Sequence, residues 1–263
     1  EDLAPLAYLR LRLSGVSDKL KFKHIVIDEG QDLTALEISV LADISGHDSI
    51  AIVGDVSQSI LPGRGLTDWK QTAGACFKGK IRTATLTLSY RTTSEIVSFS
   101  NSVLSSRHFS GALAKPVLRS GELPRLLETS TTEGQHKTIT TILGQTQARG
   151  HRNVAIITRS VTEAQLLYNA LKAQGAVVTL LQDGSDEYEG GVQVMPVYLS
   201  KGLEFDTVII TDADNEHYPD RELDAKLLYV ALTRAMHELY VLHPGQVSPL
   251  LKTTNKDLYQ NTI

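Results

Sequence analysis

Short apolar runs rich in β-branched residues alternate along this chain with segments whose apolar residues recur at helical spacing. The runs fall at residues 22–27, 50–53, 82–88, 154–158, 177–181, 192–195, 207–211 and 238–242. The segments with helical spacing fall at residues 34–44, 93–105, 132–149, 161–174 and 222–235. This alternation favours βαβ units, so we expect an α/β fold whose largely parallel sheets are flanked by helices.

The remaining segments predict a further helix and several connections. Leu3, Leu6, Leu9 and Leu13 have helical spacing, with no clear start of a domain before them, which suggests that the chain is part of a longer polypeptide. The turn-rich stretches 108–124 and 183–191 are expected to be surface connections. The polar segment that follows Pro244 is expected to be loosely held.

Composition excludes several classes of protein. The 263 residues suit one large or two modest domains, and the net charge of −4 differs from the strongly basic character of a dedicated nucleic-acid-binding domain. Cys76 is the only cysteine, which excludes an internal disulfide or a Cys-based zinc site. The apolar runs are too short to span a membrane, and no signal peptide opens the sequence, so we expect a cytoplasmic protein.

The segment Asp28-Glu29-Gly30-Gln31-Asp32 directly follows the apolar run at residues 25–27. Open α/β sheets bind ligands at the carboxyl ends of their strands, and two adjacent carboxylates there suit a Mg²⁺–nucleotide site. In such a site Asp28 would hold the metal and Glu29 would orient the attacking water. An acidic turn leading into a helix capped by Thr34 explains the same residues equally well.

Two further strand ends carry polar residues. Gln58 follows the run at 50–53 and could hydrogen-bond a terminal phosphate, although an ordinary Gly-Asp turn is the simpler interpretation of that segment alone. Arg91 follows Leu88-Ser89-Tyr90, and its guanidinium could bind phosphate oxygens and stabilise charge during phosphoryl transfer.

The last two segments of interest lie at residues 199–206 and 229–235. Taken singly, Lys201 could be a solvated lysine in a loop, and Arg234 could be a cation that complements the dipole at a helix C-terminus. The order of all five segments along the chain favours a functional interpretation instead.

Together these segments resemble motifs II to VI of superfamily 1 helicases of the UvrD/Rep/PcrA type. The matching sequences are DEGQD at 28–32, VGDVSQSI at 53–60, LSYR at 88–91, LSKGLEFD at 199–206 and YVALTRA at 229–235. The resemblance covers nearly the whole chain and implies two RecA-like lobes with ATP bound between them. Residues 1–84 would be the end of the first lobe, and residues 85–263 the second.

Matched by position, the resemblance assigns roles in the use of ATP and Mg²⁺. It makes Asp28 the metal residue, Glu29 the residue that activates water, and Gln58 the sensor of the γ-phosphate. It also implies that the parent protein is an ATP hydrolase that moves along nucleic acid.

In the second lobe, the resemblance implies nucleotide contacts from five residues. Tyr90 would stack on the adenine, Glu204 would contact the ribose, and Gly202 would lie near the phosphates. Arg91 and Arg234 would stabilise the charge that develops during phosphoryl transfer.

The chain departs from the family pattern at the phosphate cradle. It contains no Gly-x-x-x-x-Gly-Lys-Ser/Thr segment, so the backbone cradle and the lysine for the β- and γ-phosphates are missing. We therefore expect this chain alone to hydrolyse ATP poorly or not at all, and expect the missing N-terminal lobe of the same protein to be its partner.

It also departs at residues that contact single-stranded DNA in the family. Gly63, beside Arg64, stands where the family has an aromatic residue that stacks on a base. Pro196 and Tyr198 replace a threonine and a histidine, and Tyr198 could stack on a base or simply pack. Arg64 and Tyr198 thus remain candidate nucleic-acid contacts.

Arg91 and Lys201 lie too close in sequence to leave room for the large accessory domain of UvrD, Rep and PcrA. With the segment at 64–69, this resembles the compact HelD or helicase IV-like subgroup, and HelD proteins bind bacterial RNA polymerase. The leading hypothesis is a UvrD-like DNA helicase or translocase that couples ATP hydrolysis to movement on single-stranded nucleic acid or to remodelling of a nucleic-acid complex. The alternatives are a remodeller bound to RNA polymerase, a non-catalytic interaction module without a P-loop, and an unrelated nucleotide-binding enzyme.

Overall fold

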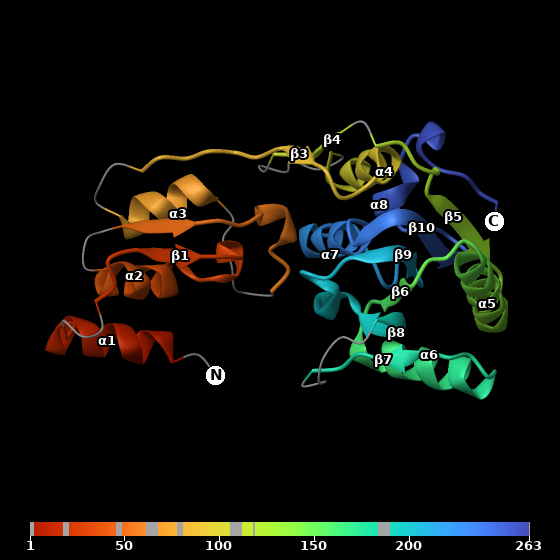
Figure 1. Cartoon of the computed structure of the whole chain (residues 1–263), viewed down its shortest axis with the longest axis horizontal. Helices are drawn as coiled ribbons and strands as arrows, with labels where there is room; N and C mark the ends of the chain where they lie inside the picture. Colours follow the sequence, from red (N-terminus) through yellow and green to blue (C-terminus); the bar gives the residue numbers. More distant parts are fainter. Residues whose placement is uncertain are drawn as a thin grey trace. The chain divides into compact units, whose positions relative to one another are not determined.

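The computed structural model describes residues 3–17, 21–45, 49–61, 68–77, 81–105, 112–117, 119–183 and 190–262. The chain divides into two compact units (Figure 1). The first comprises residues 1–86 with 110–112, and the second comprises residues 87–109 with 113–263.

The first unit is built around two parallel strands, β1 (Ile25–Ile27) and β2 (Ile50–Ile52). Helix α2 (Ala35–Ile44) connects them, and α1 (Ala4–Ser14) and α3 (Trp69–Cys76) pack against α2. Thr34 caps α2 through a reciprocal pair of bonds with Glu37, in which each residue's backbone N–H donates to the other's side chain. The helix expected at the chain start and the βαβ unit are thus both present.

The second unit contains a six-stranded parallel sheet with the order β5-β10-β9-β6-β8-β7 (Figure 1). Its strands are β5 (Arg125–Thr129), β6 (Asn153–Thr158), β7 (Thr179–Leu180), β8 (Gly191–Pro196), β9 (Phe205–Ile210) and β10 (Ala235–Pro244). The predicted α/β fold with a parallel sheet is confirmed.

Helices cover both faces of this sheet. Apolar side chains of α5 (Thr132–Ala148) and α6 (Val161–Ala173) form one core with alternate residues of the central strands, such as Ile156 and Ile209. Helices α4 (Ser94–Ser105) and α7 (Glu222–Leu232) pack against each other and against β10. Because the intervening strand residues, such as Ile157, are also fully buried, the strands read as continuous apolar runs.

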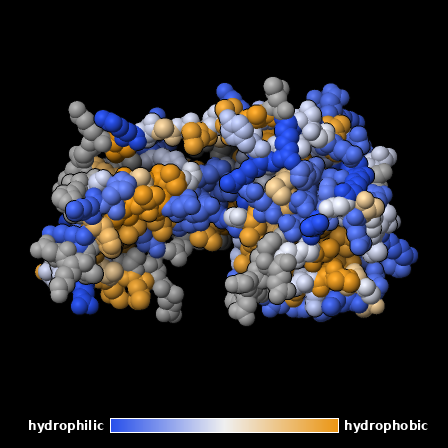
Figure 2. All heavy atoms as spheres, viewed as in Figure 1, coloured by the Kyte–Doolittle hydropathy of each residue, from blue (hydrophilic) through white to orange (hydrophobic). Residues whose placement is uncertain are grey.

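Exposed apolar side chains of the second unit include Val161, Leu166 and Val177, on or just after α6. Figure 2 shows a group of hydrophobic residues at the surface over this helix, bordered by hydrophilic ones. Among the described helices, none combines the length and the hydropathy that a membrane crossing requires.

The strand predicted at residues 82–88 is wrong for most of its length. Residues 81–87 have no regular structure, Leu86 is exposed, and only β3 (Leu88–Ser89) pairs, with β4 (Lys115–Pro116). An apolar β-prone run becomes a strand only where a neighbouring strand satisfies its backbone, and this segment connects the two units instead. The short strand β5 and helix α3 were not predicted.

The expectation of a loosely held C-terminal segment is also wrong. Ser248 caps the short helix α8 (Pro249–Lys252), and Leu250 and Leu251 are buried. The backbone of Gln260 exchanges hydrogen bonds with β5, from Leu126 N–H at 2.8 Å and to Pro124 C=O at 2.9 Å. The segment is polar overall, but these buried leucines and backbone hydrogen bonds hold it to the second unit.

Candidate functional site

In the first unit, Asp28 and Glu29 directly follow β1. Glu29 adopts a left-handed backbone conformation with a φ of 51°, and its N–H donates to Asp28 Oδ1 at 2.9 Å. The next residue, Gly30, donates to Val53 C=O at 2.9 Å, which ties the turn to the end of β2. Strained conformations of this kind concentrate at functional sites, and both carboxylates are exposed to solvent here.

Gln31 holds this turn to the second strand end. Its side chain is completely buried, and its amide nitrogen donates to the Glu29 carboxylate. Its amide oxygen accepts from the N–H of Asp55 at 2.9 Å. Gly54 leaves the space for this contact, since a Cβ there would lie 2.1 Å from the Gln31 oxygen. Gln31 was assigned no role from the sequence. The available signal was a glutamine within an acidic segment that directly follows a strand.

Gln58 lies at the end of the same connection, in the short 3₁₀ helix η3 (Val56–Gln58). Asp55 caps this helix through Ser57 N–H at 2.9 Å and accepts from the Gln58 amide at 3.0 Å. The turn at Gly54 and Asp55 that the sequence predicts is therefore present, and it also orients the Gln58 side chain. Because β1 and β2 are adjacent and parallel, their carboxyl ends lie at the same edge of this sheet. Asp28, Glu29 and Gln58 all come after these strand ends.

The oxygen ligands at this edge fit a magnesium ion held together with a nucleotide. Magnesium sites commonly use one or two carboxylates, with phosphate oxygens and water completing the octahedron. Within the described residues, no group of three or more His, Cys, Asp or Glu side chains could hold a metal ion. Asp28 could thus contribute to a Mg²⁺–phosphate site but could not form a complete metal site with its neighbours.

In the second unit, the candidate residues gather at the opposite, amino-terminal edge of the sheet. Glu204 immediately precedes β9, and its Oε1 lies 2.6 Å from Nη1 of Arg91. Tyr90 is 68% exposed, so its ring is accessible for stacking. Gly202 has a φ of +77° with open space around it, so the backbone conformation rather than crowding requires glycine there.

Arg234 lies at the same edge, just after α7 and before β10. Its side chain donates to Val230 C=O at 3.1 Å and to Leu203 C=O at 3.3 Å, and only 7% of the residue is exposed. Its own C=O accepts from Phe205 N–H at 3.0 Å. The bond to Val230 is the one expected of a cation at a helix C-terminus, while the bond to Leu203 ties Arg234 to the segment that carries Glu204.

Tyr198 lies apart from these residues, in the 3₁₀ helix η4 (Val197–Ser200) after the carboxyl end of β8. Its hydroxyl donates to Asp183 at 2.6 Å, and this hydrogen bond raises the pKa of Tyr198 above its ordinary value. Together with Leu180 and Pro196 it lines a cavity of ≈ 170 Å³. The other candidate nucleic-acid contact, Arg64, lies outside the described residues.

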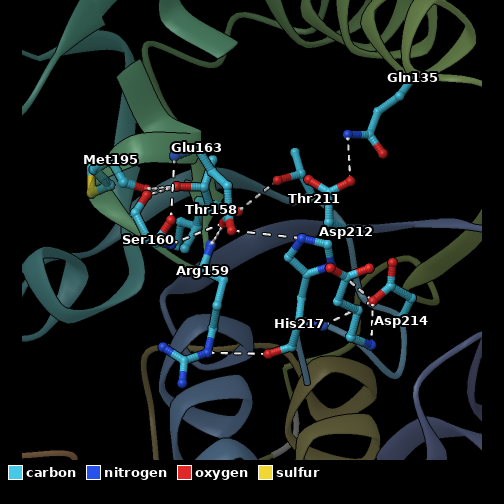
Figure 3. A network of polar contacts seen from close by, with 12 residues as sticks. Gln135, Thr158, Arg159, Ser160, Glu163, Met195, Thr211, Asp212, Asp214 and His217 are labelled. Atoms are coloured by element: carbon cyan, nitrogen blue, oxygen red, sulfur yellow. Dashed lines mark hydrogen bonds and ion pairs between the residues drawn. The ribbon is translucent and has the colours of Figure 1, made fainter. Parts of the chain in front are cut away.

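A network of polar side chains occupies the carboxyl edge of the second sheet (Figure 3). Arg159, after β6, donates to Asp224 at 2.8 Å and to His217 C=O at 3.2 Å. The His217 ring lies 2.8 Å from Asp214 and 3.6 Å from Glu163. Burial alone would lower the pKa of His217, but its hydrogen bond to Asp214 and the nearby carboxylates raise it overall.

A second left-handed residue belongs to this network. Asp212, just after β9, has a φ of 54°, and its carboxylate accepts from the Gln135 amide at 3.1 Å (Figure 3). The network contains the carboxylates of Glu163, Asp212 and Asp214 as well as that of Asp224, which pairs with Arg159. The carboxylates of this edge are thus bonded within the network, to Gln135, Arg159 and His217.

Comparison with known proteins agrees with this geometry. Residues 191–242, from β8 to β10, match the model of the UvrD-like helicase C-terminal domain, and this range includes Gly202, Glu204 and Arg234. The solved C-terminal domain of a possible DNA helicase from Lactobacillus plantarum WCFS1 is similar in structure. Its TM-score is 0.56 at 37% identity, over 65% of this chain and 98% of that domain.

The chain belongs to the UvrD-like helicase family. An Acanthamoeba polyphaga mimivirus protein named as an ATP-dependent DNA helicase is 27% identical to it over 250 residues, which is 83% of this chain. This UvrD-like chain spans about a third of that relative, 34% of its length.

Proposed function

We propose that this chain is the C-terminal part of an ATP-dependent DNA helicase or translocase that couples ATP hydrolysis to movement on single-stranded nucleic acid. The observation that carries the proposal is the gathering of Arg91, Glu204 and Arg234 at one edge of the UvrD-like domain. The residues up to 84 would belong to one RecA-like lobe and residues 85–263 to the next. Each lobe would supply part of the catalytic machinery.

In the first unit, the turn after β1 suits the activation of water. Glu29 would accept the proton of the attacking water, because its carboxylate is exposed while Gln31 fixes its orientation. Asp28 would hold Mg²⁺, which when bound neutralises negative charge on the phosphates. Gln58 would donate a hydrogen bond to the terminal phosphate, after exchanging its present bond to Asp55.

In the second unit, two arginines would stabilise the developing charge on the transferred phosphoryl group. Arg91 is currently paired with Glu204, but 78% of its side chain is exposed, and such surface pairs contribute only about 0–1 kcal/mol. A nucleotide phosphate, which binds arginine in fork geometry, can therefore replace Glu204 as the partner of Arg91. Glu204 would then contact the ribose, and Tyr90 would stack on the adenine.

A second candidate function is a remodeller that binds RNA polymerase, and the carboxylates of the carboxyl edge beside Tyr198 are compatible with it because they disfavour a nucleic-acid strand there. Asp183 binds the Tyr198 hydroxyl, and the nearby network carries several carboxylates that would repel a nucleic-acid backbone. The two functions differ in what stimulates ATP turnover. Single-stranded DNA would stimulate the translocase, whereas only RNA polymerase would stimulate the remodeller.

The test is ATP turnover of the full-length polypeptide that contains this chain, since these 263 residues lack the P-loop sequence. Glu29→Gln removes the base but keeps the size and hydrogen bonding of the side chain. We expect turnover to fall about 10²- to 10⁴-fold while nucleotide binding persists. Glu133→Gln, at an exposed carboxylate on α5, is the matched control. Undiminished turnover in Glu29→Gln would contradict the proposal.

A further inference from the structure

Arg91 lies in the short connection between β3 and α4, and its side chain is 78% exposed, so its placement depends on contacts outside that connection. Nη1 of Arg119 donates to the backbone C=O of Arg91 at 2.8 Å. In return, the C=O of Arg119 accepts from Ser94 N–H at 2.9 Å, in the first turn of α4. Arg119 thus bonds the backbone at Arg91 and again at Ser94, three residues later.

The segment that carries Arg119 is itself fastened to α4. Gly121 N–H donates to the Glu95 carboxylate at 2.8 Å, and a Cβ at Gly121 would lie 2.5 Å from the Thr93 side chain. These contacts fix where the Arg119 backbone lies. They leave its long side chain to be fixed by a partner of its own.

That partner is His237 on strand β10. Nη2 of Arg119 lies 2.9 Å from Nδ1 of His237 and 3.4 Å from its Nε2. A ring nitrogen can accept from Arg119 only while it carries no proton, and a protonated ring has no such nitrogen. His237 lies three residues after Arg234 on β10, within the register shift between Ala235 and Glu238 in the pairing of β10 with β9. The contact therefore connects the backbone of Arg91 to the strand that follows Arg234.

The surroundings of His237 favour this arrangement. Burial lowers the pKa of His237, and the Arg119 guanidinium and the His151 ring, whose centroid is 5.7 Å away, lower it further. Asp206 on β9, 3.9 Å from Nε2, and the neighbouring Glu238 act in the opposite direction. A neutral ring with its proton on Nε2 would place that proton toward Asp206 and leave Nδ1 as an acceptor for Arg119.

We propose that Arg119 is a positioning residue that holds Arg91 for phosphoryl transfer, and that neutral His237 keeps Arg119 in place. The inference rests on the proposed function, because it takes Arg91 to stabilise charge on the nucleotide. Protonation of His237 would place its positive charge beside the Arg119 guanidinium and would break the hydrogen bond between them. Arg91 would then lose its fixed position relative to Arg234.

The first test is a double-mutant comparison of ATP turnover in the full-length polypeptide. Arg119→Ala should lower kcat about tenfold to a hundredfold with a smaller change in KM, because a small displacement of a charge-stabilising group is costly. Arg82→Ala, at an exposed arginine in the connection between the units, is the matched control. Added to Arg91→Ala, Arg119→Ala should have no further effect on kcat, whereas independent effects that multiply would overturn the proposal.

The second test is the pH profile of kcat. Activity of the wild type should fall on acidification as His237 takes up a proton. His237→Gln, whose amide oxygen can still accept from Arg119, should keep its activity at neutral pH and lose that acidic decline, whereas His237→Ala should resemble Arg119→Ala. An unchanged acidic decline in His237→Gln would overturn the role of His237. If Arg91→Ala has wild-type turnover, the proposed function fails; if only Arg119→Ala does, this inference alone fails.

Discussion

The two units present their candidate residues in opposite ways. In the first unit, Asp28, Glu29 and Gln58 follow the carboxyl ends of β1 and β2, whereas in the second unit Glu204 and Arg234 precede β9 and β10. The carboxyl edge of the second sheet is occupied by a network of side chains bonded to one another.

This difference shows two ways to position a charged group. Short carboxylates are placed by the backbone, through the left-handed turn at Glu29 and the close approach at Gly54. Arginine side chains are long and flexible, so Arg91 and Arg234 depend on ion pairs and on carbonyl acceptors. The first unit should therefore be sensitive to changes at glycines, and the second to loss of side-chain partners.

The largest effect is expected from Arg234→Ala in the full-length polypeptide. Loss of a charge-stabilising arginine should lower ATP turnover about 10³-fold or more, measured at saturating ATP. Arg234→Lys keeps the charge but not the fork geometry, and should give an intermediate rate. If Arg234→Ala lowers only the melting temperature and leaves turnover intact, Arg234 is a helix-terminal cation and the comparison between the units fails.

Gly54→Ala should have a smaller effect, on folding stability. A Cβ at this position would lie 2.1 Å from the Gln31 amide oxygen, so the buried amide that holds Glu29 and Asp55 must move. We expect a loss of about 1–3 kcal/mol in the free energy of unfolding, measured with denaturant. Gly144→Ala, on α5 with nothing within 4 Å of its Cβ, is the control and should be neutral or stabilising.

The smallest expected effect concerns the carboxyl edge of the second unit. The pKa of His217 is raised in the folded state, so folding is favoured when the ring is protonated. This stabilisation is complete at a pH below the ordinary pKa of histidine. It is lost as the pH rises through the raised pKa of the folded state. His217→Gln should remove on the order of 0.5 kcal/mol of stability at pH 5.5 and little at pH 8.5.

The measurement is the free energy of unfolding of His217→Gln at both pH values. His136→Gln, on α5, is the control for the loss of a histidine. ATP turnover of the full-length polypeptide should be unchanged in His217→Gln. A large loss of turnover would show that this edge takes part in the reaction, and would remove the contrast with the first unit.

Much of the fold could be predicted from local sequence. Caps at Thr34 and Ser160 and continuous apolar runs such as residues 154–158 determine their elements almost independently of the rest. The prediction of a strand at 82–88 was wrong because the pairing of a strand depends on a partner that is distant in the sequence. Strand β5 was missed because only its position at the edge, between β10 and the Gln260 backbone, makes it a strand.

The candidate site could be predicted in part. Motif order identified the residues that carry charge, and the structure brings Arg91 and Glu204 into contact. The order of the motifs could not identify Gln31 or Arg119. These two residues act through hydrogen bonds to residues far along the chain, such as Asp55 and His237. Neither spacing nor residue type indicates such contacts.

The hydrogen bonds between Gln260 and β5 have a consequence for how this protein behaves at high concentration. An open sheet offers two unpaired edges on which another chain can add a strand and begin aggregation. Here the backbone around Gln260 occupies part of the edge at β5, and the other edge ends in β7, which is only two residues long. The C-terminal segment thus protects the sheet against edge-to-edge association.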